Sequence, residues 1–333
     1  MGSTDNLAPQ TMYGFPSLSE PDVYDVTIVG GGPAGLSAAL VLGRCRRKVL
    51  VIDSGKPRNR WSHAMHGFLS REGLAPAEFT QIARDQVFAY NTVDHKEGIA
   101  VDAYQTEDGR FMVTMEDGSQ YLSRKVLIAT GVVDELPELV NFEQFYGHSV
   151  HHCPICDGYE WRDKAIVVYG KCDKGFGLVQ EMTAWTRKLY LLSDGGCDLD
   201  AGRREYLEHL RIPIIEKRVA SLEGEGKMLK SIVFEDGESI ECDALFFSTG
   251  QKQHSDIALK LGCRLTENGC IYTGDCEATN VPGVFCSGDS SRNSQMVIVA
   301  AAEGAIAACA INKSLTGEYK DAKQQLVKAS ACK

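Results

Sequence analysis

The sequence has no long uninterrupted apolar run and no excess of positive charge. Apolar stretches such as residues 296–302 are too short to cross a bilayer, and residues 1–21 are too polar to be a signal peptide. Its 35 Lys and Arg against 45 Asp and Glu give a net charge of −10, which argues against nucleic acid or an anionic membrane as a partner. We therefore expect a cytoplasmic protein with no membrane span and with a disordered lead-in over residues 1–21.

The twelve cysteines lack the framework pattern of small secreted proteins. A zinc site would need a second closely spaced pair, and the C-terminal cysteines lie too far apart for one, so no metal site is expected. Cys45, Cys286 and Cys309 are set in apolar segments, which predicts small buried core residues. This usage fits a reducing cytosol.

One pair of cysteines two residues apart does stand out, within His151-His152-Cys153-Pro154-Ile155-Cys156-Asp157-Gly158. Two such thiols at the start of a helical turn can form and break a disulfide without moving the backbone. The free N–H groups of the turn stabilise the thiolate of the first. Asp157 is placed to give or take a proton during exchange, and the neighbouring histidines, His152 included, offer a second acceptor. A static disulfide stays an alternative, and we favour a redox dithiol.

The N-terminal part predicts a dinucleotide-binding unit. Residues 24–29 form a β-branched, apolar run, and a second such run over 49–52 ends in Asp53. Between them lies a glycine loop that opens an Ala/Leu-rich helix to about residue 44, with the sequence Gly30-Gly31-Gly32-Pro33-Ala34-Gly35. The glycines allow a tight turn, a close pyrophosphate and close helix–strand packing, and Asp53 can bind a ribose hydroxyl. Asp53 as a plain turn residue is the alternative.

The order of elements then repeats. Residues 57–73 are loop-like, a helix is predicted over 76–90, and short strands lead to Thr130 and Gly131. After the cysteines come a strand over 165–169, a loop with Gly170 and Gly175, and a strand over 189–192 before Asp194. A Glu-Asp-Gly turn begins at residue 116 and again at residue 235, and a Thr-Gly pair begins at 130 and again at 249. Both features are therefore offset by 119 residues (235 − 116 and 249 − 130). Two dinucleotide-binding folds are the natural interpretation.

A carboxylate lies close to the start of the last helix. Gly288 is expected to turn the chain off a strand, so that Asp289 is presented beside a long Ala-rich helix that begins at about Gln295. Asp289 could bind a polyol or cap that helix.

Over residues 22–318 these motifs resemble the low-molecular-weight thioredoxin reductases. The resemblance rests on the first glycine loop, Ala129-Thr130-Gly131, the dithiol with Asp157-Gly158, and Gly288-Asp289 followed by Gln295. It implies an α/β fold of two Rossmann-like (three-layer ββα) domains, the second inserted into the first. The expected boundaries are 22–135 and 257–333 for the FAD-binding domain and 136–256 for the inserted NAD(P)-binding-like domain.

The resemblance also assigns roles. It implies a homodimer in which Cys156 faces the flavin, Cys153 attacks the substrate disulfide and Asp157 is the acid/base. FAD would be held by residues of the first domain. They are Gly30, Gly32, Pro33, Ala34, Gly35, Asp53, Asn59, His66, Thr130, Gly131, Gly288, Asp289 and Gln295.

The second nucleotide site departs from the NADPH-dependent pattern. The middle glycine is replaced by Cys172, whose side chain would crowd a pyrophosphate, and Asp194 stands where an arginine cluster should begin. A 2′-phosphate beside Asp194 is disfavoured by like charge. NADPH is therefore doubtful, whereas NADH or a second FAD could use Gly170, Gly175 and Asp194. Ferredoxin-dependent, diflavin and gliotoxin-type dithiol oxidase branches are similar, although the last usually has His in place of Asp157.

We therefore predict an FAD-dependent enzyme that passes two electrons between flavin, the dithiol and a disulfide, preferably of a thioredoxin-like protein. A small-molecule disulfide and a flavin-binding sensor without turnover are the alternatives. The locally basic group around Arg44, Arg46, Arg47, Arg58 and Arg60 either neutralises helix ends or docks an acidic electron carrier such as ferredoxin. Trp61 either covers the flavin or is a partly buried aromatic.

Overall fold

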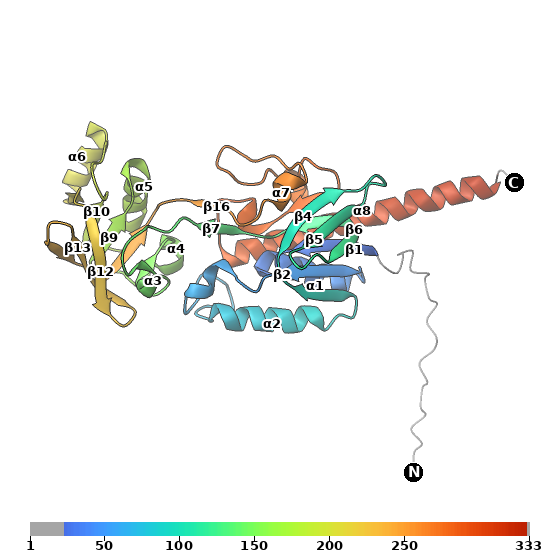
Figure 1. Ribbon diagram of the computed structural model, residues 1–333, viewed down its shortest axis with the longest axis horizontal. Coiled ribbons are helices and arrows are strands. Elements are labelled where there is room, and N and C mark those ends of the chain that lie inside the picture. Colours follow the sequence, from blue (N-terminus) through green and yellow to red (C-terminus); the bar gives the residue numbers. More distant parts are fainter. Residues whose placement is uncertain (1–22, 332–333) are drawn as a thin grey trace, which may run out of the picture.

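The computed structural model describes residues 23–331 of the chain (Figure 1). The disordered lead-in predicted over residues 1–21 lies outside the described residues. Segments from both ends of the described chain build a seven-stranded sheet in the order β3-β2-β1-β6-β5-β4, with β17 also paired to β6. Its strands are β1 (Val23–Val29), β2 (Val49–Asp53), β3 (Val93–Glu97), β4 (Ala100–Gln105), β5 (Phe111–Met115), β6 (Gln120–Ile128) and β17 (Val284–Cys286). Its helices are α1 (Pro33–Arg44), α2 (Pro76–Phe88), α7 (Ile257–Lys260) and α8 (Val297–Ala331), with short 3₁₀ turns at Arg58–Trp61, Asp275–Glu277 and Gly288–Ser290.

The middle of the chain forms a second domain around a parallel sheet in the order β11-β10-β9-β15-β8. Its strands are β8 (Val150–His151), β9 (Ile166–Tyr169), β10 (Leu189–Leu192), β11 (Ile214–Ile215) and β15 (Ala244–Phe247), and an antiparallel sheet adds β12 (Val219–Glu225), β13 (Met228–Phe234) and β14 (Ser239–Glu241). Its helices are α3 (Phe142–Phe145), α4 (Pro154–Asp157), α5 (Cys172–Met182) and α6 (Ala201–His209). The predicted repeat is confirmed, because β10-β9-β15 reproduces the order β2-β1-β6.

Two antiparallel strands connect the domains. β7 (Val132–Asp134) leaves the first domain and pairs with β16 (Gln251–Gln253), which returns to it. In Figure 1 this pair crosses between the two domains, which lie side by side along the long axis. The fold is therefore the α/β arrangement predicted, with one Rossmann-like domain inserted into another.

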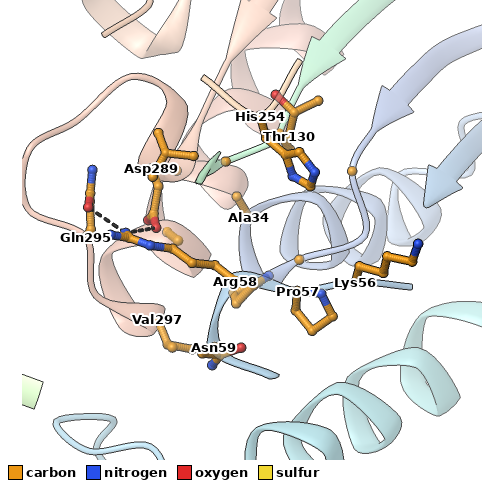
Figure 2. Close-up of a pocket in the computed structure, with 18 of the residues that line it drawn as sticks. Ala34, Lys56, Pro57, Arg58, Asn59, Thr130, His254, Asp289, Gln295 and Val297 are labelled. Atoms are coloured by element: carbon orange, nitrogen blue, oxygen red, sulfur yellow. Dashed lines mark hydrogen bonds and ion pairs between the residues drawn. The ribbon is translucent and has the colours of Figure 1, made fainter. Parts of the chain in front are cut away.

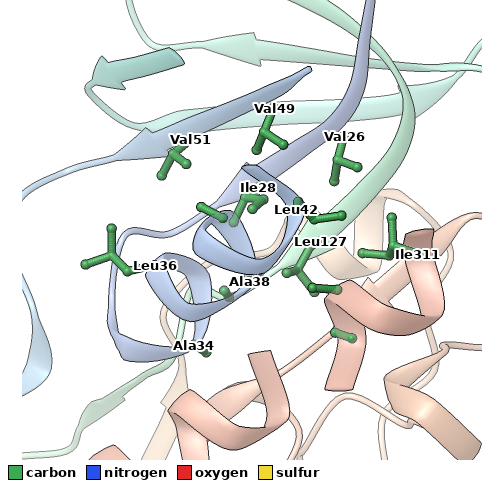
Figure 3. Close-up of a cluster of buried hydrophobic side chains, with 14 of the residues drawn as sticks. Val26, Ile28, Ala34, Leu36, Ala38, Leu42, Val49, Val51, Leu127 and Ile311 are labelled. Atoms are coloured by element: carbon green, nitrogen blue, oxygen red, sulfur yellow. The ribbon is translucent and has the colours of Figure 1, made fainter. Parts of the chain in front are cut away.

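The core of the first domain holds the glycine loop in place. Alanines and leucines on one face of α1 pack on Val26, Ile28 and Leu127 of the sheet, and Ile311 of α8 closes the cluster (Figure 3). These three sheet residues and Ile311 are fully buried. Burying a Leu or Ile side chain contributes about 1.5–3 kcal/mol, so this packing fixes the start of α1 against the end of β1.

The long final helix departs from the expectation that every apolar segment is too short for a bilayer. Among the described residues one stretch, Val297–Glu318 of α8, is long and apolar enough to cross a membrane by length and composition alone. One such helix is weak evidence, because a core helix passes the same test. Ala307, Ala308, Ile311 and Leu315 of this stretch are fully buried in the first domain.

Two of the cysteine predictions were wrong. Cys286 is buried in β17, but Cys45 and Cys309 are exposed. Cys45 directly follows the last residue of α1, and Cys309 is an exposed residue within α8. An apolar local sequence therefore did not determine which side of these helices faces the core.

Candidate active site

A cavity of about 710 Å³ lies between the two domains. Its lining includes most of the cofactor-binding residues predicted from the sequence, among them Asp289 and Gln295 (Figure 2). Both cysteines of the dithiol also line it. The predicted residues that line it are Gly30, Gly32, Pro33, Ala34, Asp53, Asn59, His66, Thr130, Gly131, His152, Cys153, Cys156, Asp157, Gly288, Asp289 and Gln295. Gly35 does not line the cavity but packs against the Gly30 carbonyl of the loop. Gly170, Gly175 and Asp194 belong to the second nucleotide site, in the inserted domain.

The glycine loop has the geometry that a pyrophosphate requires. Gly30 has a φ of 111°, and a Cβ there would lie 2.2 Å from the carbonyl oxygen of Ala129. A Cβ at Gly35 would lie 1.9 Å from the carbonyl oxygen of Gly30, so the helix can approach the strand only without a side chain. A Cβ at Gly32 would meet open space, and Gly32 is the N-cap of α1 with no side chain capping the helix. The free N–H groups of α1 can therefore bind phosphate oxygens.

Asp53 lies where a ribose is expected. It ends β2, and a Cβ at Gly31 would come within 2.5 Å of its Oδ2 atom. Arg84 of α2 donates to the same oxygen at 3.3 Å and holds the carboxylate at the edge of the cavity. These residues fit the adenosine half of FAD.

Residues that follow β6 and β17 form another part of the cavity wall. Thr130 and Gly131 follow β6, and the Ser290 hydroxyl contacts the Thr130 hydroxyl at 3.3 Å and donates to the Gly131 carbonyl at 3.2 Å. Gly288 has a φ of 77°, and its N–H donates to Glu303 of α8 at 2.9 Å. These contacts direct Asp289 into the cavity beside the start of α8.

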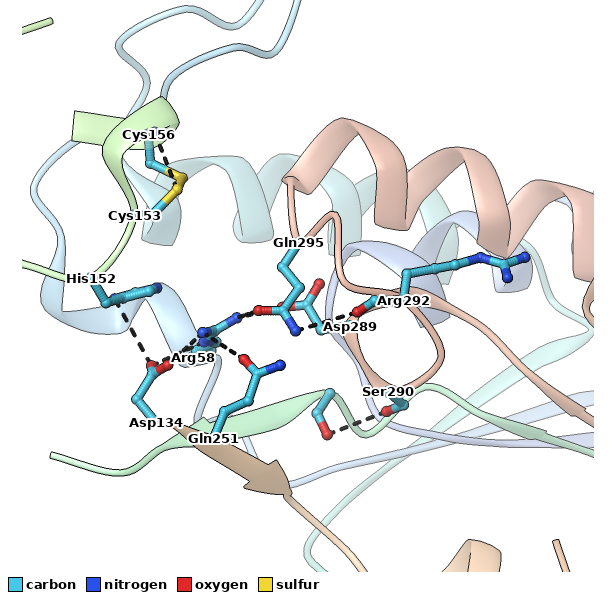
Figure 4. Close-up of polar contacts among 12 residues, drawn as sticks. Arg58, Asp134, His152, Cys153, Cys156, Gln251, Asp289, Ser290, Arg292 and Gln295 are labelled. Carbon is cyan, nitrogen blue, oxygen red and sulfur yellow. Dashed lines mark hydrogen bonds and ion pairs between the residues drawn. A yellow bond between two sulfur atoms is a disulfide. The ribbon is translucent and has the colours of Figure 1, made fainter. Parts of the chain in front are cut away.

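Arg58 is the hub of the polar network in this cavity (Figure 4). Its guanidinium donates to Asp289 at 3.1 Å, to Gln295 at 2.5 Å and, through Nε, to Asp134 at 3.0 Å. The grouping of Arg58 with a basic docking surface was wrong, because its side chain is only 17% exposed and points into the cavity. The sequence carried a signal for this role, since Arg58 directly precedes the predicted Asn59.

The pKa values of the two carboxylates that flank Arg58 are shifted in opposite directions. Burial raises the pKa of Asp289, and the nearby charges of Asp134 and Glu303 add to this, while Arg58 opposes it. Burial would also raise the pKa of Asp134, but its hydrogen bond with Arg58 and the charges of His152 and Arg58 outweigh burial and lower it. Asp134 was not predicted from the sequence, because an acidic residue in a short connecting strand shows no pattern.

The dithiol is presented by the short helix α4 at the end of β8. Cys153 is its N-cap, forms a disulfide with Cys156 and has a Cα–Cα distance of 5.3 Å to it. The backbone N–H of Cys156 donates to the Cys153 sulfur at 3.2 Å. A hydrogen bond to a charged group contributes about 1.5–3 kcal/mol, so this N–H favours a thiolate at Cys153 after reduction.

The two histidines before Cys153 have different surroundings. His151 is buried and its Nδ1 lies 3.3 Å from Asp157. His152 lines the cavity, 3.4 Å from the Tyr146 hydroxyl and 4.0 Å from Asp134. Burial is the main cause that lowers the pKa of His152, against the opposing charge of Asp134.

His66 and Trp61 lie in the segment between β2 and α2. His66 Nδ1 pairs with Glu72 at 2.6 Å, and its Nε2 lies 3.8 Å from Glu160 of the inserted domain. Trp61 is 42% exposed and packs on Tyr146 with ring centroids 6.1 Å apart. Cavity-lining residues that were not predicted as cofactor ligands include Lys56, Pro57, Tyr146 and His254.

The second nucleotide site keeps only part of the geometry of the first. A Cβ at Gly175 would lie 2.3 Å from the Gly170 carbonyl oxygen, which repeats the close approach between Gly35 and Gly30. Cys172 replaces the middle glycine and has a φ of 45°, a conformation that favours glycine. Asp194 accepts hydrogen bonds from the Tyr169 hydroxyl and the Val219 N–H, both at 2.9 Å. Both of its carboxylate oxygens therefore have partners within the protein.

Comparison with known proteins identifies the family. Residues 24–304 match the family described as pyridine nucleotide-disulphide oxidoreductase. The chain belongs to this family. Thioredoxin reductase tcpT of Claviceps purpurea is 31% identical, over 82% of this chain and 88% of its own length. A thioredoxin reductase of Aquifex aeolicus is 26% identical, over 91% and 97%.

Solved structures give the same picture. The crystal structure of HlmI has a TM-score of 0.90 and 30% identity, and covers 94% of this chain and 99% of its own. An oxidoreductase from Agrobacterium tumefaciens has a TM-score of 0.81 and 33% identity, with coverage of 88% and 98%. The chain is thus a thioredoxin reductase-like, FAD-dependent oxidoreductase that acts on disulfides, as the sequence predicted.

Proposed function

We propose that this enzyme passes two electrons between FAD, the Cys153–Cys156 dithiol and the disulfide of a thioredoxin-like protein. The observation that carries the proposal is that the dithiol lines the same cavity as the glycine loop, Asp289 and Gln295. The curated relatives named thioredoxin reductase support the choice of substrate. A small-molecule disulfide is the alternative that the experiment below separates from it.

FAD, when bound, supplies the two-electron exchange with the dithiol. In the reducing direction the Cys153 thiolate attacks one sulfur of the substrate, and the departing thiolate takes a proton from Asp157. The Cys156 thiolate then attacks the Cys153 sulfur and releases the second substrate thiolate. One disulfide is reduced and the Cys153–Cys156 disulfide forms, so the electrons balance. The N–H of Cys156 stabilises the Cys153 thiolate before the attack.

NADPH is not the donor in this proposal. Support comes from Cys172, whose side chain lies at the start of α5 where a phosphate would need bare backbone. Asp173, on the same turn, forms an ion pair with Arg203 of α6, so this arginine is already paired. Asp194 adds negative charge at the end of β10. NADH or a second FAD tolerates that charge better than a 2′-phosphate does.

An acidic carrier such as ferredoxin remains an alternative donor. The basic surface that would bind it is smaller than the sequence suggested, because Arg58 faces the cavity and Arg47 donates to Asn312 of α8 at 2.7 Å. Arg44, Arg46 and Arg60 are left as its candidates. We further propose a cytoplasmic homodimer with no nucleic-acid or membrane partner, and with domain boundaries at 22–135, 136–256 and 257–333.

The test is anaerobic reduction of the FAD-loaded protein by NADPH, NADH and reduced ferredoxin, read as bleaching of the flavin. Turnover is then measured with thioredoxin and with a small aromatic disulfide. We expect slow bleaching by NADPH and saturation by thioredoxin at micromolar concentration. Rapid stoichiometric bleaching by NADPH contradicts the donor, faster turnover of the small disulfide contradicts the protein substrate, and no turnover with any reductant leaves only a sensor.

A further inference from the structure

The candidate proton donor of the dithiol is held by a buried histidine. His151 Nδ1 lies 3.3 Å from the Asp157 carboxylate, and the His151 side chain is only 3% exposed. It projects from β8 and packs on Phe246 of β15, with ring centroids 5.3 Å apart. The ring is therefore fixed by the central sheet of the inserted domain.

Trp161 favours one of the two tautomers of His151. The Trp161 indole Nε1–H donates to His151 Nε2 at 3.0 Å. An indole N–H can only donate, so Nε2 must present a lone pair. When the Trp161 bond forms, the proton of the neutral ring is on Nδ1, which can donate it to Asp157. The chain of hydrogen bonds runs in one direction, from Trp161 through His151 to the carboxylate.

We propose that Trp161 and His151 are positioning residues for Asp157. The inference rests on the proposed function, in which Asp157 gives a proton to the thiolate that leaves during exchange. The Nδ1–H of His151 fixes the rotation of the carboxyl group toward the cavity that both cysteines line. A hydrogen bond donated to a carboxylate is stronger than one donated to a carboxylic acid, so the same N–H favours release of the proton.

The His148 carbonyl offers the other tautomer a partner. It lies 3.1 Å from His151 Nε2 and can only accept, so it is satisfied when Nε2 carries a proton. In that state the Trp161 N–H loses its acceptor, and Nδ1 carries a lone pair and cannot donate to Asp157. Trp161 therefore selects between two tautomers, of which one orients the carboxylate.

Other charged groups also surround the pair and would shape any pH profile. From the segment around β8 they are the side chains of His148 and His152. From β7 and from the loop after β2 they are Asp134 and Arg58, which act on His152. From the β12–β13 turn, Lys227 contacts His148 Nε2 at 2.9 Å. Within the described part of the chain, His151 is the side chain that pairs with Asp157, so variants at His151 test the donor itself.

Three substitutions separate positioning from packing. His151→Asn keeps an amide N–H at the position of Nδ1, His151→Gln moves it to the position of Nε2, and His151→Phe has none. We expect the Asn variant to exchange within about threefold of wild type and the Gln and Phe variants to lose at least tenfold. Trp161→Phe should lose a few-fold, because His151 is then free to adopt either tautomer. Trp185→Phe is the matched control, since Trp185 packs on Gly158 near the same helix, and should not change the rate.

The experiment uses the FAD-loaded chain reduced with dithionite and mixed with a small aliphatic disulfide from pH 5 to 9, because an aliphatic thiolate is basic enough to need a proton as it leaves. The rate of the first thiolate release is followed by stopped flow. In His151→Gln and His151→Phe the alkaline limb of the profile, where the proton donor is lost, should move to higher pH, and His151→Asn should keep the wild-type profile. FAD content and circular dichroism identify any variant that fails to fold.

The outcomes distinguish this inference from the proposed function. A wild-type dithiol that does not exchange at all contradicts the proposed function. Wild-type exchange with the same rate and pH profile in folded Gln, Phe and Asn variants overturns the positioning role and leaves the proposed function intact. A uniform loss in all three, with an unshifted pH profile, shows that His151 only packs and also overturns the inference.

Discussion

The Arg58 guanidinium and the Asp134 carboxylate form an ion pair beside the cavity between the two domains. Nε of Arg58 lies 3.0 Å from Asp134 Oδ2, and the side chains are 17% and 7% exposed. The same guanidinium reaches Asp289, while the Tyr146 hydroxyl donates to Asp134 at 3.1 Å. Arg58 thus joins residues of the first domain to the connecting strand β7.

Arg58→Met should therefore destabilise the protein strongly. It leaves two largely buried carboxylates, Asp134 and Asp289, without their shared cation, and breaking such a pair costs about 3–5 kcal/mol. The loss should shrink as the pH falls toward 4, because the carboxylates can then be protonated. Urea unfolding of the apoprotein at pH 7 and pH 4.5 measures both effects.

Arg203→Met is the control for this prediction. Arg203 also pairs with an aspartate, but the two side chains are 37% and 72% exposed, so the loss should stay below about 1 kcal/mol. Equal losses in the two variants would show that burial of the Arg58 pair has no energetic consequence.

Changing two glycines of the first loop to alanine should have different effects, one on stability and the other on FAD affinity. In Gly35→Ala the Cβ would lie 1.9 Å from the Gly30 carbonyl oxygen, so α1 must move and the fold should lose several kcal/mol. In Gly32→Ala the Cβ meets only open space, so apoprotein stability should change by about 1 kcal/mol or less while FAD affinity falls. Thermal unfolding and titration with FAD separate the two.

Gly177→Ala provides the reference for both. Gly177 lies inside α5, where an added methyl group would meet open space and φ is in the ordinary helical range, so alanine should be neutral or slightly stabilising. Tight FAD binding by Gly32→Ala would contradict the assignment of the pyrophosphate to this loop.

Much of this site could be predicted because its parts are local. The glycines of the first loop, Asp53 and the dithiol each depend on residues adjacent in sequence, and β10 was predicted at the residues where it lies. The repeat of the two domains also shows in sequence, because both use the same turn chemistry. Local steric requirements of this kind produce a residue pattern that can be recognised in a single sequence.

The polar network could not be predicted in the same way. Arg58, Asp134 and Gln251 come from separate segments and meet only because β7 and β16 pair between the domains. Asp194 was predicted as a ribose ligand from its place after a strand, yet Tyr169 and Val219 already occupy its oxygens. Long-range contacts of this kind depend on the packing of the whole fold.

The two cysteines should give different spectra when one is removed. If Cys156 faces the flavin, Cys153→Ser reduced by dithionite should show a long-wavelength thiolate-to-flavin band, and Cys156→Ser should not. Both variants should lose disulfide turnover, because exchange needs both thiols. The opposite spectra would exchange the two roles, and turnover in either variant would remove the dithiol from the mechanism.

Cys172→Gly tests whether the cysteine in the second glycine loop excludes NADPH. Cys172 has a φ of 45°, so glycine should be accommodated without loss of stability. We expect bleaching of the flavin by NADPH to become faster in this variant, because the backbone is then open to a pyrophosphate. Stopped-flow absorbance under anaerobic conditions measures the rate. An unchanged rate would mean that Asp194 or the Asp173–Arg203 pair, and not Cys172, limits binding.

His152 should make the folded protein less stable in mild acid. Burial lowers its pKa in the folded state, so the unfolded chain, with an ordinary value near 6.5, binds a proton more readily. The contribution of His152 to stability is therefore complete above about pH 6.5 and is lost as the pH falls below it, by at most about 1.4 kcal/mol per pH unit. Asp134, whose pKa is lowered from 3.8, loses its contribution only at more acidic pH.

His152→Gln separates these two windows, because glutamine does not titrate. The variant should lose less stability than wild type between pH 6.5 and 5, and the difference should be visible in urea unfolding of the apoprotein across that range. His148→Gln should act in the same direction, since burial and the charge of Lys227 lower the pKa of His148 as well. Parallel stability curves for His152→Gln and wild type would show that the histidine next to Cys153 can take up a proton in the folded protein at no cost, and would leave it free to accept one from the dithiol.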